Sequence, residues 1–137
     1  MTLWGLPLRV YQQEEGSTMK IAEYVGNNIV IIEPHGRLTL ETLHDFRRAV
    51  ARRIQQGWQG LIVDLQNIDY IDSAGLGALA AAYTSCKRRG MRLVLVRVFG
   101  RNRELLMVTR LLTVFDVYDT TLEAERGFAR PPEATVM

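Results

Sequence analysis

The chain has 137 residues, of which 47% are hydrophobic and 23% charged, as expected for one soluble globular domain. Seventeen basic residues against 15 acidic ones leave a formal net charge of +2, which is too small to argue for direct nucleic-acid binding. A single cysteine, Cys86, excludes an internal disulfide, and no apolar run approaches the ~20 residues of a membrane helix, so we expect a cytoplasmic protein without a membrane span.

The first 18 residues stand apart from the rest of the chain. Pro7 interrupts an apolar stretch, and residues 12–18 are polar. Three interpretations stay open for this extension: an extra strand, a tail, or translation upstream of a true start at Met19. We therefore assign residues 1–18 to an N-terminal extension, 19–130 to one domain and 131–137 to a C-terminal tail.

Two strands and a long helix are predicted next. Residues 21–24 and 28–33 are strand-like, and Gly26-Asn27 between them supplies the left-handed conformations that a tight hairpin requires. A helix is predicted from about Thr39, as its cap, to Gln56, with Gly57 ending it. Apolar residues recur at helical spacing along it, namely Leu40, Leu43, Phe46, Val50 and Ile54.

Strands and helices alternate in the rest of the chain. The pattern predicts a buried strand at 61–65, a helix at 76–87, a strand at 93–98, a helix capped by Asn102, and a last helix that Thr120-Thr121-Leu122-Glu123 opens as a capping box. This alternation indicates an α/β domain. Helical crossovers predict parallel neighbouring strands, while the first hairpin is antiparallel, so the sheet is expected to be mixed.

The run from Tyr70 to Gly77 is the most informative feature of the chain. A strand leads towards it and an Ala/Leu-rich helix leaves it, which places the Ser73 hydroxyl at a helix N-terminus beside the carboxylate of Asp72. Unpaired N–H groups at a helix start carry partial positive charge and favour a phosphate there. Gly75 and Gly77 remove side chains near Ser73, so another protein could approach it closely.

This turn and its flanks resemble the STAS domain family, and within it the anti-sigma factor antagonists. The family pattern is an apolar strand ending in Asp-Leu, a short link, Asp-Ser-(Ser/Ala)-Gly-Leu-Gly and a helix, which is how residues 61–77 read here. Residues 29–38, 93–98 and 111–128 are also similar to the family's other strands and its last helix. The resemblance implies a single STAS-like α/β domain, with a small mixed β-sheet and helices packed mainly on one face.

The resemblance also implies a phosphorylation switch. An unphosphorylated antagonist binds an anti-sigma factor that is often a serine kinase; the kinase then phosphorylates the motif serine, here Ser73, and a phosphatase resets it. The partner surface would combine the serine turn with the turn after the second strand, where Thr39 replaces a frequent acidic residue. Its expected residues are His35, Gly36, Arg37, Thr39, Asp72, Ser73, Ala74, Gly75, Leu76 and Gly77.

Alternatives to this switch stay open. Ser73 could be only a helix cap, and Thr39 a cap rather than a second phosphorylation site. Many STAS domains bind partners without phosphorylation, so a second interpretation is an interaction subunit of a signalling scaffold or a lipid-transport complex. An exposed partner surface could also form a homodimer.

The sequence argues against an enzyme. The Gly-x-Ser-x-Gly nucleophile elbow is absent because Ile71 stands at its first position, and there is no phosphate-binding loop. A small hydrolase would require His35 or His44 as the base for Ser73. Two histidines and one cysteine do not make a typical zinc site, so we predict no catalytic residues, no metal and no cofactor.

Overall fold

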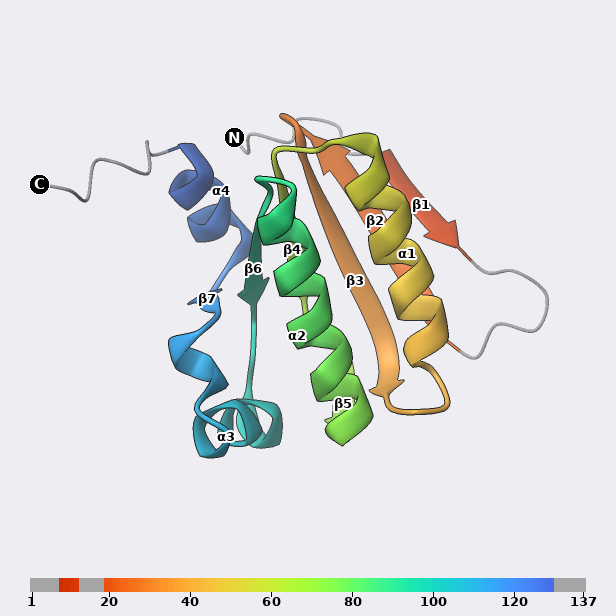
Figure 1. The fold of residues 1–137 in the computed structure, drawn as a ribbon, viewed down its shortest axis with the longest axis vertical. Helices are drawn as coiled ribbons and strands as arrows, with labels where there is room; N and C mark the ends of the chain where they lie inside the picture. Colours follow the sequence, from red (N-terminus) through yellow and green to blue (C-terminus); the bar gives the residue numbers. More distant parts are fainter. Residues whose placement is uncertain (1–7, 13–18, 130–137) are drawn as a thin grey trace, which may run out of the picture.

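The computed structural model describes residues 8–12 and 19–129 (Figure 1). The outer parts of the extension, residues 1–7 and 13–18, and the predicted tail lie outside the described residues. Within the described part the elements are β1 Leu8–Gln12, β2 Lys20–Gly26, β3 Ile29–Leu38, α1 Leu43–Gln56, β4 Gly60–Asp64, β5 Ile68–Ile71, α2 Ser73–Arg88, β6 Arg92–Val96, α3 Gly100–Val108, a 3-10 turn Leu111–Thr113, β7 Asp116–Tyr118 and α4 Thr121–Ala129.

The sheet is mixed, with strand order β1-β2-β3-β4-β6-β7. β1, β2 and β3 pair antiparallel, whereas β4, β6 and β7 continue the sheet in parallel. β3 is ten residues long and changes partner along its length. Its first half pairs with β4, and its last residues, Gly36–Leu38, pair with β5. The end of β5, from which the Ser73 turn starts, therefore lies beside the end of β3.

Helices cover the two faces of the sheet unequally. Alternate residues of β3 divide between two cores, because successive side chains of a strand point to opposite faces. Val30 and Ile32 pack with residues of α1, α2 and α3, while Ile29 and Ile31 pack with Ala124 and Phe128 of α4. The predicted α/β domain with a mixed sheet and helices mainly on one face is confirmed.

Several predicted boundaries of strands and helices were wrong, because backbone pairing between the strands sets different ends for these elements. The hairpin between β2 and β3 turns at Asn27 and Asn28, with φ of 52° and 64°, rather than at Gly26-Asn27. β3 runs on to Leu38, so α1 begins at Leu43 and not near Thr39. Leu40 consequently falls in the intervening turn, where it is 72% exposed instead of buried.

The second half of the chain shows two further differences. Asn102 does not cap α3 but is buried inside it, where its Nδ2 donates a hydrogen bond of 2.8 Å to the carbonyl oxygen of Ile68. Residues 111–118, similar to one family strand, form a 3-10 turn and the short β7. The predicted cap of α4 is present: the N–H of Glu123 donates to Thr120 Oγ1 at 3.1 Å.

None of the helices in the described part of the chain combines the length and the apolarity that crossing a bilayer demands.

A buried ion pair connects β2 to α1. The carboxylate of Glu23 is 0% exposed and accepts hydrogen bonds from Arg53 Nε at 2.6 Å and Arg52 Nη2 at 3.4 Å. We expect Glu23→Ala to lower the free energy of unfolding by about 3–5 kcal/mol, because it leaves the Arg53 side chain, which is only 11% exposed, without its counter-charge. Urea denaturation at constant m-value measures this loss.

The exposed pair between Arg92 and Asp116 supplies the matched control. Its N···O distance is 2.9 Å, but both side chains are at least 42% exposed, and water screens such a pair. Asp116→Ala should therefore cost only about 0–1 kcal/mol. Equal losses of unfolding free energy in the two variants would contradict the conclusion that the buried Glu23 ion pair stabilises the fold more than the exposed Arg92–Asp116 pair.

Candidate functional site

Asp72 organises the turn that carries Ser73. Its Oδ1 accepts the backbone N–H of Gly75 at 2.8 Å, which caps the start of α2. Its Oδ2 accepts the backbone N–H of Leu40 at 3.1 Å, in the turn between β3 and α1. The N–H of Asp72 also donates to the carbonyl oxygen of Leu38 at 3.2 Å. One residue thus joins two turns that are 32 residues apart in the chain.

These bonds determine the charge at the turn. The N–H of Gly75, followed by that of Leu40, stabilises the carboxylate and holds the pKa of Asp72 below its usual range. Asp72 is therefore ionised at neutral pH. Cys86, by contrast, is fully buried on α2, and burial raises the pKa of its thiol to about 11.

Ser73 is the first residue of α2, and its side chain is exposed. The capping role belongs to Asp72, so the interpretation of Ser73 as a simple cap is not needed. Within the described residues the Ser73 hydroxyl makes no hydrogen bond to a histidine or a carboxylate. The Ser73 hydroxyl is therefore exposed at the start of α2, beside the Asp72 carboxylate that caps the helix.

The two glycines of the motif differ in their surroundings. Gly75 is buried, and a Cβ there would lie 2.1 Å from the carbonyl oxygen of Leu38. The missing side chain at Gly75 is thus required inside the domain, where α2 crosses the end of β3. A Cβ at Gly77 would meet nothing within 4 Å, and Gly77 is exposed. Gly77 is therefore the glycine that leaves space beside Ser73.

The turn after β3 brings only part of the predicted partner surface beside Ser73. Leu40 is exposed next to the Asp72 carboxylate, although the sequence pattern had assigned it to the core. Thr39 is buried, and its N–H donates to Thr42 Oγ1 at 2.9 Å, so it stabilises the turn. Gly36 has a φ of 109°, and Arg37 lies with its guanidinium 4.9 Å from the centre of the Tyr70 ring.

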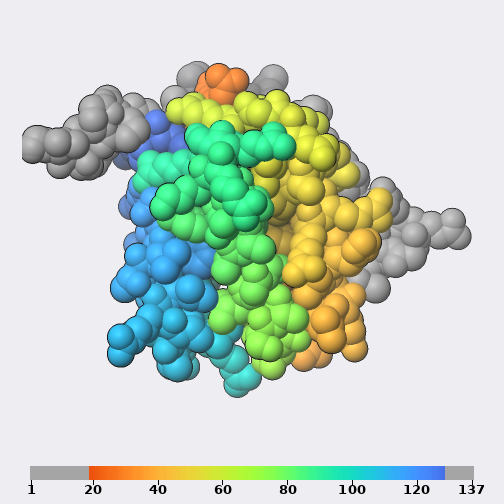
Figure 2. Space-filling view, viewed as in Figure 1, coloured from red at the N-terminus to blue at the C-terminus, as the bar shows by residue number. Residues whose placement is uncertain are grey.

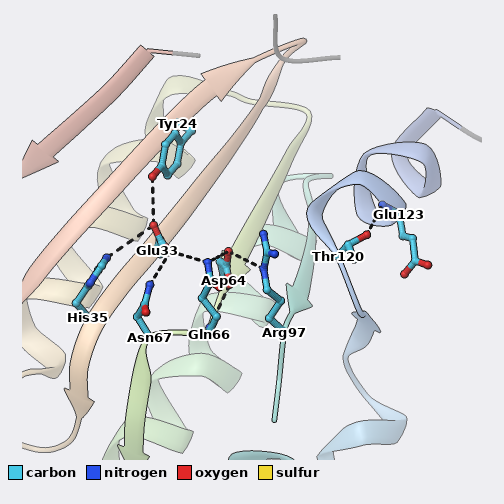
Figure 3. Close-up of polar contacts among 9 residues, drawn as sticks. All are labelled: Tyr24, Glu33, His35, Asp64, Gln66, Asn67, Arg97, Thr120 and Glu123. Atoms are coloured by element: carbon cyan, nitrogen blue, oxygen red, sulfur yellow. Dashed lines mark hydrogen bonds and ion pairs between the residues drawn. The ribbon is translucent and has the colours of Figure 1, made fainter. Parts of the chain in front are cut away.

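His35 lies in a different polar network, on the sheet face that α4 covers in part (Figure 3). Its Nε2 is 3.7 Å from the carboxylate of Glu33, which is too far for a hydrogen bond. That carboxylate accepts hydrogen bonds from Tyr24, Gln66 and Asn67. Asp64 joins this network through Gln66, and burial raises its pKa while Arg97, 3.3 Å away, opposes the shift. The structure therefore separates His35 from the hydrogen bonds of Asp72.

The contrast between the two glycines gives a paired prediction. Gly75→Ala should lower the free energy of unfolding by about 1–3 kcal/mol, because its methyl group would collide with backbone that has no room to move. Gly77→Ala should instead raise it by about 0.5–1 kcal/mol, since alanine loses less backbone entropy in a helix. Thermal and urea unfolding of the two variants test this, and a stabilising Gly75→Ala would contradict the close contact with Leu38.

The lowered pKa of Asp72 gives a prediction about pH. A carboxyl whose pKa is lower in the folded state stabilises the fold above its unfolded pKa, and this contribution disappears as pH falls through the folded pKa. Asp72→Asn should therefore be less stable than the parent protein at pH 7. The difference should shrink progressively below about pH 4. Unfolding curves at several pH values measure it; a difference independent of pH would show that charge at Asp72 is not involved.

Curated relatives are similar to most of this chain. A candidate anti-sigma factor antagonist of Thermotoga neapolitana is 29% identical over 98 residues, which cover 71% of this chain and 87% of the relative. A second candidate anti-sigma factor antagonist, from Thermotoga maritima, is 27% identical over 99 residues, which cover 72% of this chain and 88% of the relative.

Solved structures share the fold. The crystal structure of a candidate anti-sigma factor antagonist from Thermotoga maritima matches with a TM-score of 0.73 and 25% identity, over 79% of this chain and 93% of that one. The Bacillus cell fate determinant SpoIIAA in its phosphorylated form matches with a TM-score of 0.62 over 90% of this chain and 100% of that one. At 18% identity, this second match is a likeness of fold alone.

One family model matches most of the chain. The family model of the STAS domain matches residues 20–124, from the start of β2 into α4. This range includes both turns that Asp72 joins and the whole of α1 and α2. The chain therefore belongs to the STAS domain family.

Proposed function

We propose that this protein is an anti-sigma factor antagonist, a regulatory protein that binds an anti-sigma factor with serine kinase activity and is released when Ser73 is phosphorylated. The observation that carries the proposal is the exposed Ser73 hydroxyl at the first turn of α2, which Asp72 holds beside the turn after β3. The names of the Thermotoga relatives support the antagonist role. Such a role belongs in the cytoplasm, where a phosphatase would regenerate the unmodified form.

The surroundings of Ser73 suit a serine that is a substrate. A kinase must bring its own catalytic base and phosphate donor close to the hydroxyl, so the acceptor serine needs exposure and open space. Ser73 and Gly77 are both exposed, and nothing of the described structure stands over Gly77. The exposed side chain of Leu40 provides an apolar contact for the partner next to the Ser73 hydroxyl, and Asp72 holds the backbone of Leu40 in place.

Electrostatics give the switch its direction. A phosphoserine carries about −1.5 to −2 charges at neutral pH. It would stand beside the ionised carboxylate of Asp72, with the exposed Asp69 on β5 nearby in the chain. Packing three negative groups against a partner adds repulsion and desolvation cost to the complex. The positive end of α2 favours the phosphate within the domain, so phosphorylation would change the docking surface and leave the fold intact.

The first test measures the intact mass of the protein isolated from its native cells, beside Ser73→Ala. We expect a species heavier by about 80 Da, the mass of one added phosphate, that disappears in the variant. Ser73→Asp should weaken binding of the anti-sigma factor by at least about tenfold, because it places a permanent charge at the contact.

Other outcomes would point elsewhere. An unmodified mass under all growth conditions, with Ser73→Asp binding as well as the parent protein, would contradict the switch. The alternative would then be an interaction subunit of a scaffold or a transport complex that needs no phosphorylation. Global loss of amide protection on phosphorylation would contradict the claim that only the docking surface changes.

A further inference from the structure

An apolar groove runs between α1 and α2, on the outer side of the helix pair. Its volume is about 210 Å³. In Figure 2 it lies between the yellow atoms of α1 and the green atoms of α2. The groove is lined by Phe46, Arg47, Val50, Ala51, Ile54, Ala78, Ala81, Ala82 and Ser85.

The groove exists because α2 carries small side chains where it faces α1. Ala78 and Ala82 are buried and set the depth of the groove, whereas Ala81 and Ala51 are exposed on its opposite walls. Larger residues at these positions would fill the space between the helices. A groove with apolar walls between two helices is the shape that receives the apolar face of an amphipathic helix.

Charge around the groove is mainly positive. Arg47 is its only charged lining residue, and it is exposed. α2 contains no acidic residue and ends in the exposed Lys87 and Arg88. On α1 the arginines outnumber the acidic residues four to one, and Arg52 and Arg53 bind Glu23. An occupant of the groove therefore gains from carboxylates around its apolar face.

The groove continues the surface that carries Ser73. Ser73, Gly77 and Ala81 follow at intervals of four along α2, so they lie near one another on the helix surface, and all three are exposed. Ser73 and Ala81 are separated by about 12 Å along the helix axis. If a second copy of this chain docked through the same face, the basic residues beside the two grooves would face each other. Their repulsion disfavours a dimer at this surface.

We infer that the α1–α2 groove is the docking site of an acidic amphipathic helix of the partner protein, which holds the partner while Ser73 enters its active site. The inference rests on the proposed function for the identity of the partner, and on the groove itself for the chemistry of the helix. The apolar face of that helix would rest on Ala81 and Val50. Its carboxylates would meet Arg47 on one side and Lys87 and Arg88 at the far end.

Site-specific photo-cross-linking in the native cells tests this inference. Ala81→p-benzoylphenylalanine places the probe on the α2 wall of the groove, and Ala51→p-benzoylphenylalanine places it on the α1 wall. Both positions are exposed, so the fold is expected to survive, which thermal unfolding verifies. The expected product is a partner segment with more Asp and Glu than Lys and Arg, and with apolar residues at helical spacing of three and four.

Two variants control for position and charge. Thr84 is exposed on the same helix but lies outside the groove. Thr84→p-benzoylphenylalanine should therefore give far less cross-linked product than the probes on the groove walls. Arg47→Glu, combined with the probe at position 81, should lower the yield at least about tenfold by placing like charges in contact. A basic segment, a segment from a second copy, equal products at 81 and 84, or no product at either wall would overturn the inference.

The same experiment separates this inference from the proposed function. If an anti-sigma factor co-purifies with the parent protein but neither wall yields a product, the groove is not the docking site and the proposed function stands. If an acidic helix of an unrelated protein is captured at both walls, the groove is confirmed and the proposed partner is wrong.

Discussion

The candidate site depends on the two hydrogen bonds that the carboxylate of Asp72 accepts from backbone N–H groups. One oxygen caps α2 and the other holds the turn after β3, so a single side chain connects the two turns next to Ser73. Backbone N–H groups at a helix start and in a turn have no partners of their own, and a carboxylate that takes one from each satisfies both. The same charge remains beside Ser73, where it would oppose an incoming phosphate at a protein interface.

This arrangement needs the unusual length of β3. Because β3 gives its first residues to β4 and its last ones to β5, the chain reaches the serine turn at the edge where β3 also ends. The buried Gly75 then lets α2 approach the carbonyl oxygen of Leu38. Backbone pairing, a glycine contact and a cap thus act together to bring Leu40 and Ser73 to one surface.

The two faces of the sheet have different chemistry. On one side α1 and α2 bury the larger apolar core and leave an apolar groove with cationic margins between them. On the other side α4 covers a smaller core, and the buried carboxylates of Glu33 and Asp64 both accept hydrogen bonds from Gln66. Charge that could meet a partner is thus positive along the helix pair and negative at the Ser73 turn. If Ser73 is phosphorylated as we propose, this division of charge would confine the effect of the phosphate to the Ser73 turn.

The sequence by itself determined the fold class, the serine turn and the capped start of α4. These features depend on local signals: apolar periodicity, an Asp-Ser pair between a strand and a helix, and a Thr three residues before a Glu. Tertiary structure decided the rest, because the deciding partner was distant in the chain. β5 is four residues long and forms as a partner of β3. Leu40 lies exposed in the turn that follows the end of β3 at Leu38, and His35 lies beside Glu33 on the other face of the sheet. The α1–α2 groove is likewise a product of packing, since neither helix alone shows where the alanines of one leave space beside the other.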